Sequence, residues 1–141
     1  MLLHHPDFVV VEYAVNDPNT RGAAESLEGL IRQVVRETNQ PAVLLLFTMN
    51  QDGGNAQEWQ SKVGRHYDLP MVSFRDALWP EISEGRMRWS DVEADVVHPN
   101  DRGHEHCARF VARLLDQVLK NLPADEGLPQ VKPVPQPLIS D

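Results

Sequence analysis

Two apolar runs separated by an amphipathic segment constrain the fold of this chain most strongly. Residues 8–15 run Phe-Val-Val-Val-Glu-Tyr-Ala-Val, and residues 42–47 run Ala-Val-Leu-Leu-Leu-Phe. Such nearly continuous apolar runs are typical of strands that are buried on both faces of a sheet. Between them, residues 22–38 place leucine, isoleucine and valine at spacings of three and four, which predicts a helix. This order predicts a parallel β-α-β unit.

The later part of the chain continues the alternation of helix and strand. The residue pattern predicts a helix over about 56–67, a short strand over 69–74 and a long amphipathic helix from 101 to about 122. Residues 75–94 contain proline, glycine and tryptophan without a clear period, so we expect short helical turns in an irregular excursion there. The fold class that follows is α/β, a flavodoxin-like three-layer α/β/α arrangement around a parallel sheet.

The position of the first strand suggests that this sheet is incomplete. The run at 8–15 has the composition of a central strand, which needs neighbours on both sides, yet the chain after it supplies strands for one side only. We therefore expect further strands on its N-terminal side to be missing. A strand left without its neighbour exposes an apolar edge that pairs with other chains, so self-association through this edge is expected.

Proline content changes sharply after residue 122. Five prolines follow, at positions 123, 129, 133, 135 and 137, and the segment shows no apolar periodicity. This pattern predicts a folded part over 1–122 and an extended proline-rich tail or linker over 123–141. We expect that trimming the tail leaves stability almost unchanged.

Charge and composition exclude several classes of function. Lys and Arg number 13 against 21 Asp and Glu, so the net charge of −8 disfavours a nucleic-acid partner. No apolar run reaches the roughly 18 to 20 residues that a membrane span requires. The single cysteine, Cys107, allows no internal disulfide, and no targeting signal is visible, so the sequence leaves the localisation undetermined.

Polar residues that could carry chemistry follow the predicted strands. Ligands of open α/β sheets bind beyond the carboxyl ends of the strands, where Asn16 follows the first run and Asn50 and Gln51 follow the second. His98 lies in the loop before the last helix, with Asp95 three residues earlier. An aspartate at that spacing can accept the Nδ1 proton of the histidine and leave Nε2 to act as a base.

Two stretches of the sequence together resemble the SGNH (GDSL-type) hydrolases. Residues 6–17, which end in Ala-Val-Asn-Asp, resemble the third sequence block of that family, and Asp-Val-Val-His-Pro at 95–99 resembles the fifth. The resemblance implies a serine ester hydrolase, with His98 as general base, Asp95 as its orienting partner and Asn16 as an oxyanion-hole donor. It further implies a small-molecule or carbohydrate ester as substrate. Asn50 and Gln51, by their place beyond the carboxyl end of the second strand, are candidate substrate-side groups.

The sequence also departs from the family. The glycine that usually lies two residues before the asparagine of the third block is Ala14 here. No Gly-Asp-Ser occurs, so the chain lacks the nucleophile of the family, and the block that carries a second, glycine oxyanion donor is also missing. The resemblance therefore implies the C-terminal portion of an SGNH domain, and we expect the chain as written to be inactive alone.

Other readings of these residues remain open. The chain could be a non-catalytic remnant that keeps the α/β scaffold and binds a carbohydrate or a protein. His98, His104 and His106, with Asp95 and Asp101, could ligate a metal, but a His-x5-His-x-His spacing fits no standard zinc site. We therefore expect neither a metal nor another cofactor.

Overall fold

The computed structural model describes residues 3–122 and 133–139 of the chain. Its sheet has three parallel strands in the order β1-β2-β3. The strands alternate with helices along the chain, as predicted, and the elements are β1 (Phe8–Val11), α1 (Arg21–Val35), β2 (Ala42–Phe47), α2 (Gln57–His66), β3 (Met71–Ser73), α3 (Phe74–Ser83), a 3-10 turn (Trp89–Asp91) and α4 (Asp101–Lys120).

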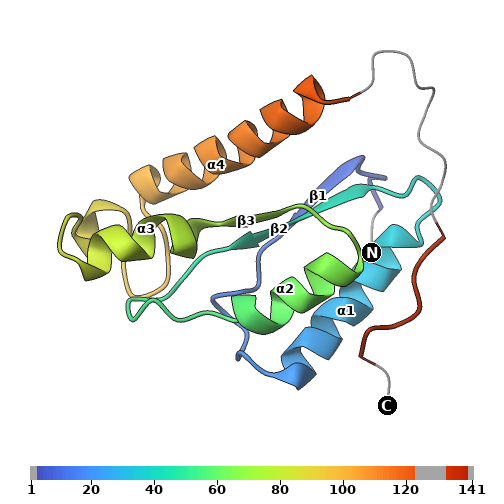
Figure 1. Ribbon diagram of the computed structural model, residues 1–141, viewed down its shortest axis with the longest axis horizontal. Coiled ribbons are helices and arrows are strands. Elements are labelled where there is room, and N and C mark those ends of the chain that lie inside the picture. Colours follow the sequence, from blue (N-terminus) through green and yellow to red (C-terminus); the bar gives the residue numbers. More distant parts are fainter. Residues whose placement is uncertain (1–2, 123–132, 140–141) are drawn as a thin grey trace.

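The helices lie in two layers on opposite sides of the sheet (Figure 1). Alternate residues of β2 point to opposite faces, as the pleat of a strand requires. Leu45 packs in one buried cluster with α1 and α2, whereas Leu46 packs against a second cluster formed around α3 and the first turns of α4. The predicted three-layer α/β/α arrangement is therefore confirmed.

The strand register brings the carboxyl ends of the strands to one edge of the sheet. Val11 lies opposite Leu45 in β2, which in turn lies opposite Met71 in β3. The loops that follow β1 and β2 therefore leave the sheet on the same side, as parallel pairing demands. Asn100 caps α4, because its side chain accepts hydrogen bonds from the backbone N–H groups in the first turn of that helix.

The first strand is shorter and more exposed than predicted. β1 ends at Val11, because the chain turns at once, with the backbone N–H of Asn16 donating to the carbonyl of Tyr13. Phe8 is 38% exposed and Val10 is 44% exposed, so burial on both faces was a wrong expectation for this chain. Among the described residues β1 pairs with β2 alone, and the expected exposed apolar edge is confirmed.

A regular helix occupies part of the stretch that was expected to be irregular. Ser73 caps α3 by accepting a hydrogen bond from the backbone of Asp76, and Phe74 and Leu78 anchor the helix in the core. Pro80 lies inside this helix, which explains why the residue pattern concealed it. The expected short helical turn does occur farther along, at Trp89–Asp91.

The longest helix, α4, packs against the rest of the described chain mainly through its N-terminal end. Of the residues in α4, Gly103 and Cys107 are buried, both near its N-terminal end. A Cβ at Gly103 would collide with the carbonyl oxygen of Val92, so glycine allows this close approach. Farther along, Val118 is 45% exposed and Leu119 is 65% exposed, so the C-terminal half of α4 presents apolar side chains that no described residue covers.

The end of the chain docks on the folded part, which corrects the expectation that the whole tail contributes little to the core. Val134 and Ile139 pack against the cluster between the sheet and α1 and α2. The buried carboxylate of Glu28 accepts hydrogen bonds from the backbone N–H groups of Leu138 and Ile139, at 2.5 and 2.9 Å. Residues 123–132 lie outside the described residues.

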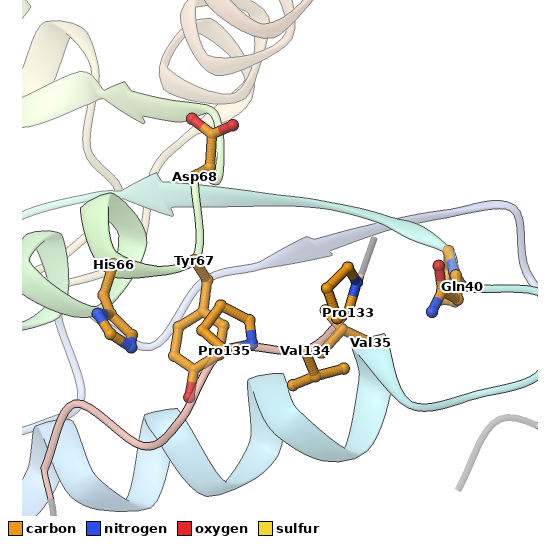
Figure 2. Close-up of a pocket in the computed structure, with 9 residues that line it drawn as sticks. Val35, Gln40, His66, Tyr67, Asp68, Pro133, Val134 and Pro135 are labelled. Atoms are coloured by element: carbon orange, nitrogen blue, oxygen red, sulfur yellow. The ribbon is translucent and has the colours of Figure 1, made fainter. Parts of the chain in front are cut away.

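Tyr67 organises the site at which this segment docks (Figure 2). Its hydroxyl donates to Glu28 at 2.6 Å and accepts from Arg32 at 2.8 Å. Arg32 also donates to the carbonyl of Pro135 at 2.6 Å, and a ring nitrogen of His66 lies 2.7 Å from the carbonyl of Gln136. Polar side chains of the folded part thus bind the backbone of the segment, while Val134 and Ile139 pack against the core. The prolines of the segment favour its extended conformation.

Candidate active site

A closed loop presents His98 at the N-terminal end of α4. The backbone N–H of Ala94 donates to the carbonyl of His98 at 2.8 Å, and that of Asn100 donates to Val92 at 3.0 Å. Glu93 and Pro99 pair across the base of the loop as an isolated antiparallel bridge. These bonds hold the residues between them in one conformation, with His98 exposed to solvent.

The carboxylate of Asp95 makes three hydrogen bonds in this loop, two with His98 and one with Val97. One carboxylate oxygen lies 2.8 Å from Nδ1 of the imidazole, and the other accepts from the backbone N–H groups of Val97 and His98, each at 2.9 Å. The backbone N–H of Val97, followed by the side chain and the backbone of His98, lowers the pKa of Asp95 to about 2. An ionised Asp95 fixes the proton on Nδ1 and leaves Nε2 as the nitrogen that can accept one.

His98 and Asn16 face one cavity of about 270 Å³ at the carboxyl edge of the sheet. The side-chain amide of Asn16 has no hydrogen-bond partner among the described residues, so its N–H groups are available to a ligand. The two sequence blocks thus meet at one cavity. The cavity is lined by Glu12, Val15, Asn16, Leu46, Thr48, Val97, His98, Pro99, His104 and Cys107.

Comparison with known proteins agrees with this geometry. The sequence matches the GDSL-like lipase/acylhydrolase family over residues 1–106, which includes both blocks. The chain belongs to this family. The search found no curated protein that matches the sequence.

Solved structures of an esterase resemble this member of the GDSL-like family. A two-domain esterase active on acetylated mannans is 36% identical and superposes with a TM-score of 0.88 over 99% of this chain. A second structure of such an esterase, co-crystallised with mannopentaose, gives 37% identity and a TM-score of 0.82 over 92% of this chain. The chain spans 37% and 36% of the lengths of those two chains.

The structure adds two polar residues, Glu12 and Thr48, to the cavity of this GDSL-like chain that the sequence analysis did not single out. Oε1 of Glu12 accepts hydrogen bonds from the hydroxyl and the backbone N–H of Thr48, at 2.8 and 3.4 Å. This contact joins the ends of β1 and β2 beneath the cavity. The signal in the sequence was a single charge, Glu12, inside an otherwise apolar run.

Asn50 and Gln51 do not line the cavity. The side chain of Asn50 accepts hydrogen bonds from the backbone of Asp52 and Gly54 and so closes its own loop. Gln51 is exposed, and its backbone N–H donates to the carbonyl of Val96. The geometry gives Asn50 a structural task and lends no support to a substrate-side role for either residue.

The cavity of this GDSL-like chain contains no serine among the residues that line it. Ser26, Ser61 and Ser83 each donate to a carbonyl within their own helix, and Ser73 caps α3. Ser140 lies outside the described residues. Within the described part of the chain, the structure also groups no three His, Cys, Asp or Glu side chains as a metal site, and contains no helix able to span a membrane.

Cys107 does line the cavity, but its environment opposes nucleophilic chemistry. Burial, together with the charges of Glu93 and Glu12, raises the pKa of its thiol to about 11. The thiolate is the reactive form of cysteine, so this thiol remains protonated and inert near neutral pH.

Proposed function

We propose that this chain supplies the base, its orienting carboxylate and one oxyanion donor of an acyl-ester hydrolase. The single observation that carries the proposal is the meeting of Asn16 and His98 at one cavity, with Asp95 bonded to Nδ1 of His98. Family membership supports the same reaction class.

Each of these groups has a defined task in the proposed reaction. The hydroxyl oxygen of a serine, supplied from outside this chain, attacks the ester carbonyl carbon while Nε2 of His98 takes its proton. Asp95 stabilises the resulting imidazolium, and the amide of Asn16 donates to the oxyanion. His98 then gives the proton to the leaving alcohol, and water cleaves the acyl-serine by the same route.

The structure supports the need for a complementary portion that carries this serine. The exposed side chains of β1 and the uncovered apolar half of α4 lie on a chain that spans 37% of the similar esterase. Burying such surfaces is strongly favourable, so a portion that packs against them would complete both the core and the cavity.

Acetylated carbohydrates are the proposed substrates. The support is the similarity to an esterase active on acetylated mannans, at 36% identity and with 99% of this chain covered. An acetylated mannan carries acetyl esters on its sugar hydroxyls, and these are the acyl and alcohol groups that we propose for this site.

One observation favours a second candidate function. No serine lines the cavity among the described residues, which is what a non-catalytic remnant that binds a carbohydrate or protein would show. Such a remnant would have no need of the Asp95–His98 hydrogen bond, so the two candidates differ in their dependence on His98.

Fragment complementation tests the proposed function. The chain is co-expressed with the part of the similar mannan esterase that it does not cover, and acetate release from acetylated mannan and 4-nitrophenyl acetate is measured. We expect hydrolysis that falls about a thousandfold or more in His98→Ala, as for a lost catalytic base, and that persists in His106→Ala, a matched change outside the cavity. A folded complex without activity, or with activity unchanged in His98→Ala, would contradict the proposed function, and an inactive complex would favour the remnant.

A further inference from the structure

Glu93 is a buried carboxyl at the base of the loop that carries Asp95 and His98. The residue is 3% exposed, and neither of its carboxyl oxygens has a hydrogen-bond partner among the described residues. A buried anion without a partner is costly, because protein surrounds it with fewer compensating dipoles than water does. The carboxyl of Glu93 therefore holds its proton more firmly than an ordinary glutamate.

A second buried glutamate shows that a buried carboxyl without hydrogen-bond partners is not a general feature of the fold. Glu28 is also 3% exposed, yet its oxygens accept hydrogen bonds from Tyr67, Leu138 and Ile139. Burial alone would raise the pKa of Glu28, but these bonds outweigh it and lower the pKa. The structural carboxylate of Glu28 thus has hydrogen-bond partners for its oxygens, whereas the carboxyl of Glu93 has none among the described residues.

The charges that act on Glu93 come from the proposed catalytic pair. Burial raises the pKa of Glu93 to about 7, with the negative charge of Asp95 adding to the rise and the positive charge of His98 opposing it. From α4, the thiol of Cys107 faces the same group, and its own pKa is raised in part by Glu93 and by Glu12 after β1. Of these neighbours, only His98 can carry a positive charge.

We propose that Glu93 is a positioning residue for the Asp95–His98 pair, whose buried carboxyl releases its proton to solvent when His98 takes one up. This inference rests on the proposed function only in taking His98 as the base. Glu93 touches no reacting atom. It acts through the electrostatic effect of its charge on Asp95 and His98.

Burial makes Glu93 suited to this task in a way that Asp95 is not. The side chain of Asp95 is 53% exposed, so water and salt screen its charge. A charge on Glu93 acts through protein, where a pair interaction is several times stronger than in water. While His98 is neutral, a protonated Glu93 avoids a buried anion, and once the imidazolium forms, the ionised Glu93 stabilises it.

Carbon-13 NMR of the Glu93 carboxyl in the complete chain tests the proposal. We expect a titration midpoint near pH 7. The midpoint should rise by roughly half a pH unit in His98→Asn, which removes the cation, and fall by a similar amount in Asp95→Asn, which removes the anion. His104→Asn serves as the matched control, because His104 lines the same cavity from α4 and its change should leave the midpoint in place.

The unsubstituted chain also tests the proposal without any variant. A Glu93 midpoint near its ordinary 4.5, or a midpoint unmoved in a folded His98→Asn chain, would overturn the proposal. The measurement needs no substrate, so its failure is distinct from failure of the hydrolase proposal, which complementation tests.

Discussion

Two acidic residues on one loop have pKa values that their surroundings shift in opposite directions. Asp95 is exposed and accepts hydrogen bonds from Val97 and His98, which lower its pKa to about 2. Glu93, two positions earlier, is buried without a partner, and burial raises its pKa to about 7. At neutral pH the first is fully ionised and the second is divided between its two forms. Desolvation and hydrogen bonding, not residue type, decide the charge at each position.

The raised pKa of Glu93 predicts a specific dependence of stability on pH. The folded chain binds the Glu93 proton more tightly than the unfolded chain, so this contribution to stability is present below pH 4.5 and is lost as pH rises through about 7. The loss corresponds to about 3 kcal/mol. Urea unfolding at pH 5 and pH 8 should show it, and Glu93→Gln should remove most of the difference. An equal pH dependence in both proteins would contradict the assignment.

At the scale of elements, the features that depend on neighbouring residues could be predicted from the sequence. Those that depend on residues far apart in the chain could not. The apolar run of β2, the stripe of α4 and the loop positions of Asn16 and His98 follow from neighbouring residues, and the structure agrees with each. The docking of residues 133–139 depends on Glu28, more than a hundred residues earlier, so composition alone suggested a linker.

The burial of Glu93 at the candidate site could not be predicted from the sequence. Whether a glutamate is exposed, bonded or buried without a partner depends on how the loop folds back on α4, and no periodic pattern encodes it. The shortening of β1 has a similar origin, since the turn at Tyr13–Asn16 interrupts an apolar run that would otherwise continue as a strand.

The docked C-terminal segment should detach when its acceptor is weakened. Glu28→Gln removes the negative charge that two backbone N–H groups share with Tyr67, and charge-assisted hydrogen bonds of this kind contribute about 1.5 to 3 kcal/mol each. We expect hydrogen exchange at Leu138 and Ile139 to accelerate at least tenfold. Glu25→Gln, an exposed change on the same helix, should leave the exchange unaltered. Unchanged protection in Glu28→Gln would show that packing alone holds the segment.

At the scale of the whole molecule, the exposed edge of the sheet should govern association. Val10 lies 44% exposed on β1, which has a free edge among the described residues. Self-association through this edge would bury apolar surface and pair free backbone groups. Sedimentation velocity should therefore show concentration-dependent oligomers that diminish in Val10→Lys. Gln33→Lys adds the same charge at an exposed position of α1 and should leave the oligomers in place. Equal effects of both substitutions would point to net charge as the cause.

The residues that line the cavity predict that the chain alone does not hydrolyse esters. The proposed base and one oxyanion donor are present, but no serine lines the cavity among the described residues. Loss of an oxyanion donor costs on the order of 3 kcal/mol, or about a hundredfold in rate, and loss of the nucleophile removes the covalent route altogether.

Hydrolysis of 4-nitrophenyl acetate by the purified chain should therefore equal that of its His98→Ala variant. A rate that depends on His98 would mean that a nucleophile of this chain reaches Nε2 after all. Cys107 is an alternative nucleophile that lines the cavity, but a thiol with a pKa of about 11 has roughly one thiolate in a thousand molecules at pH 8. Its contribution would rise about tenfold per pH unit and vanish in Cys107→Ala, whereas a serine-dependent rate would persist in that variant.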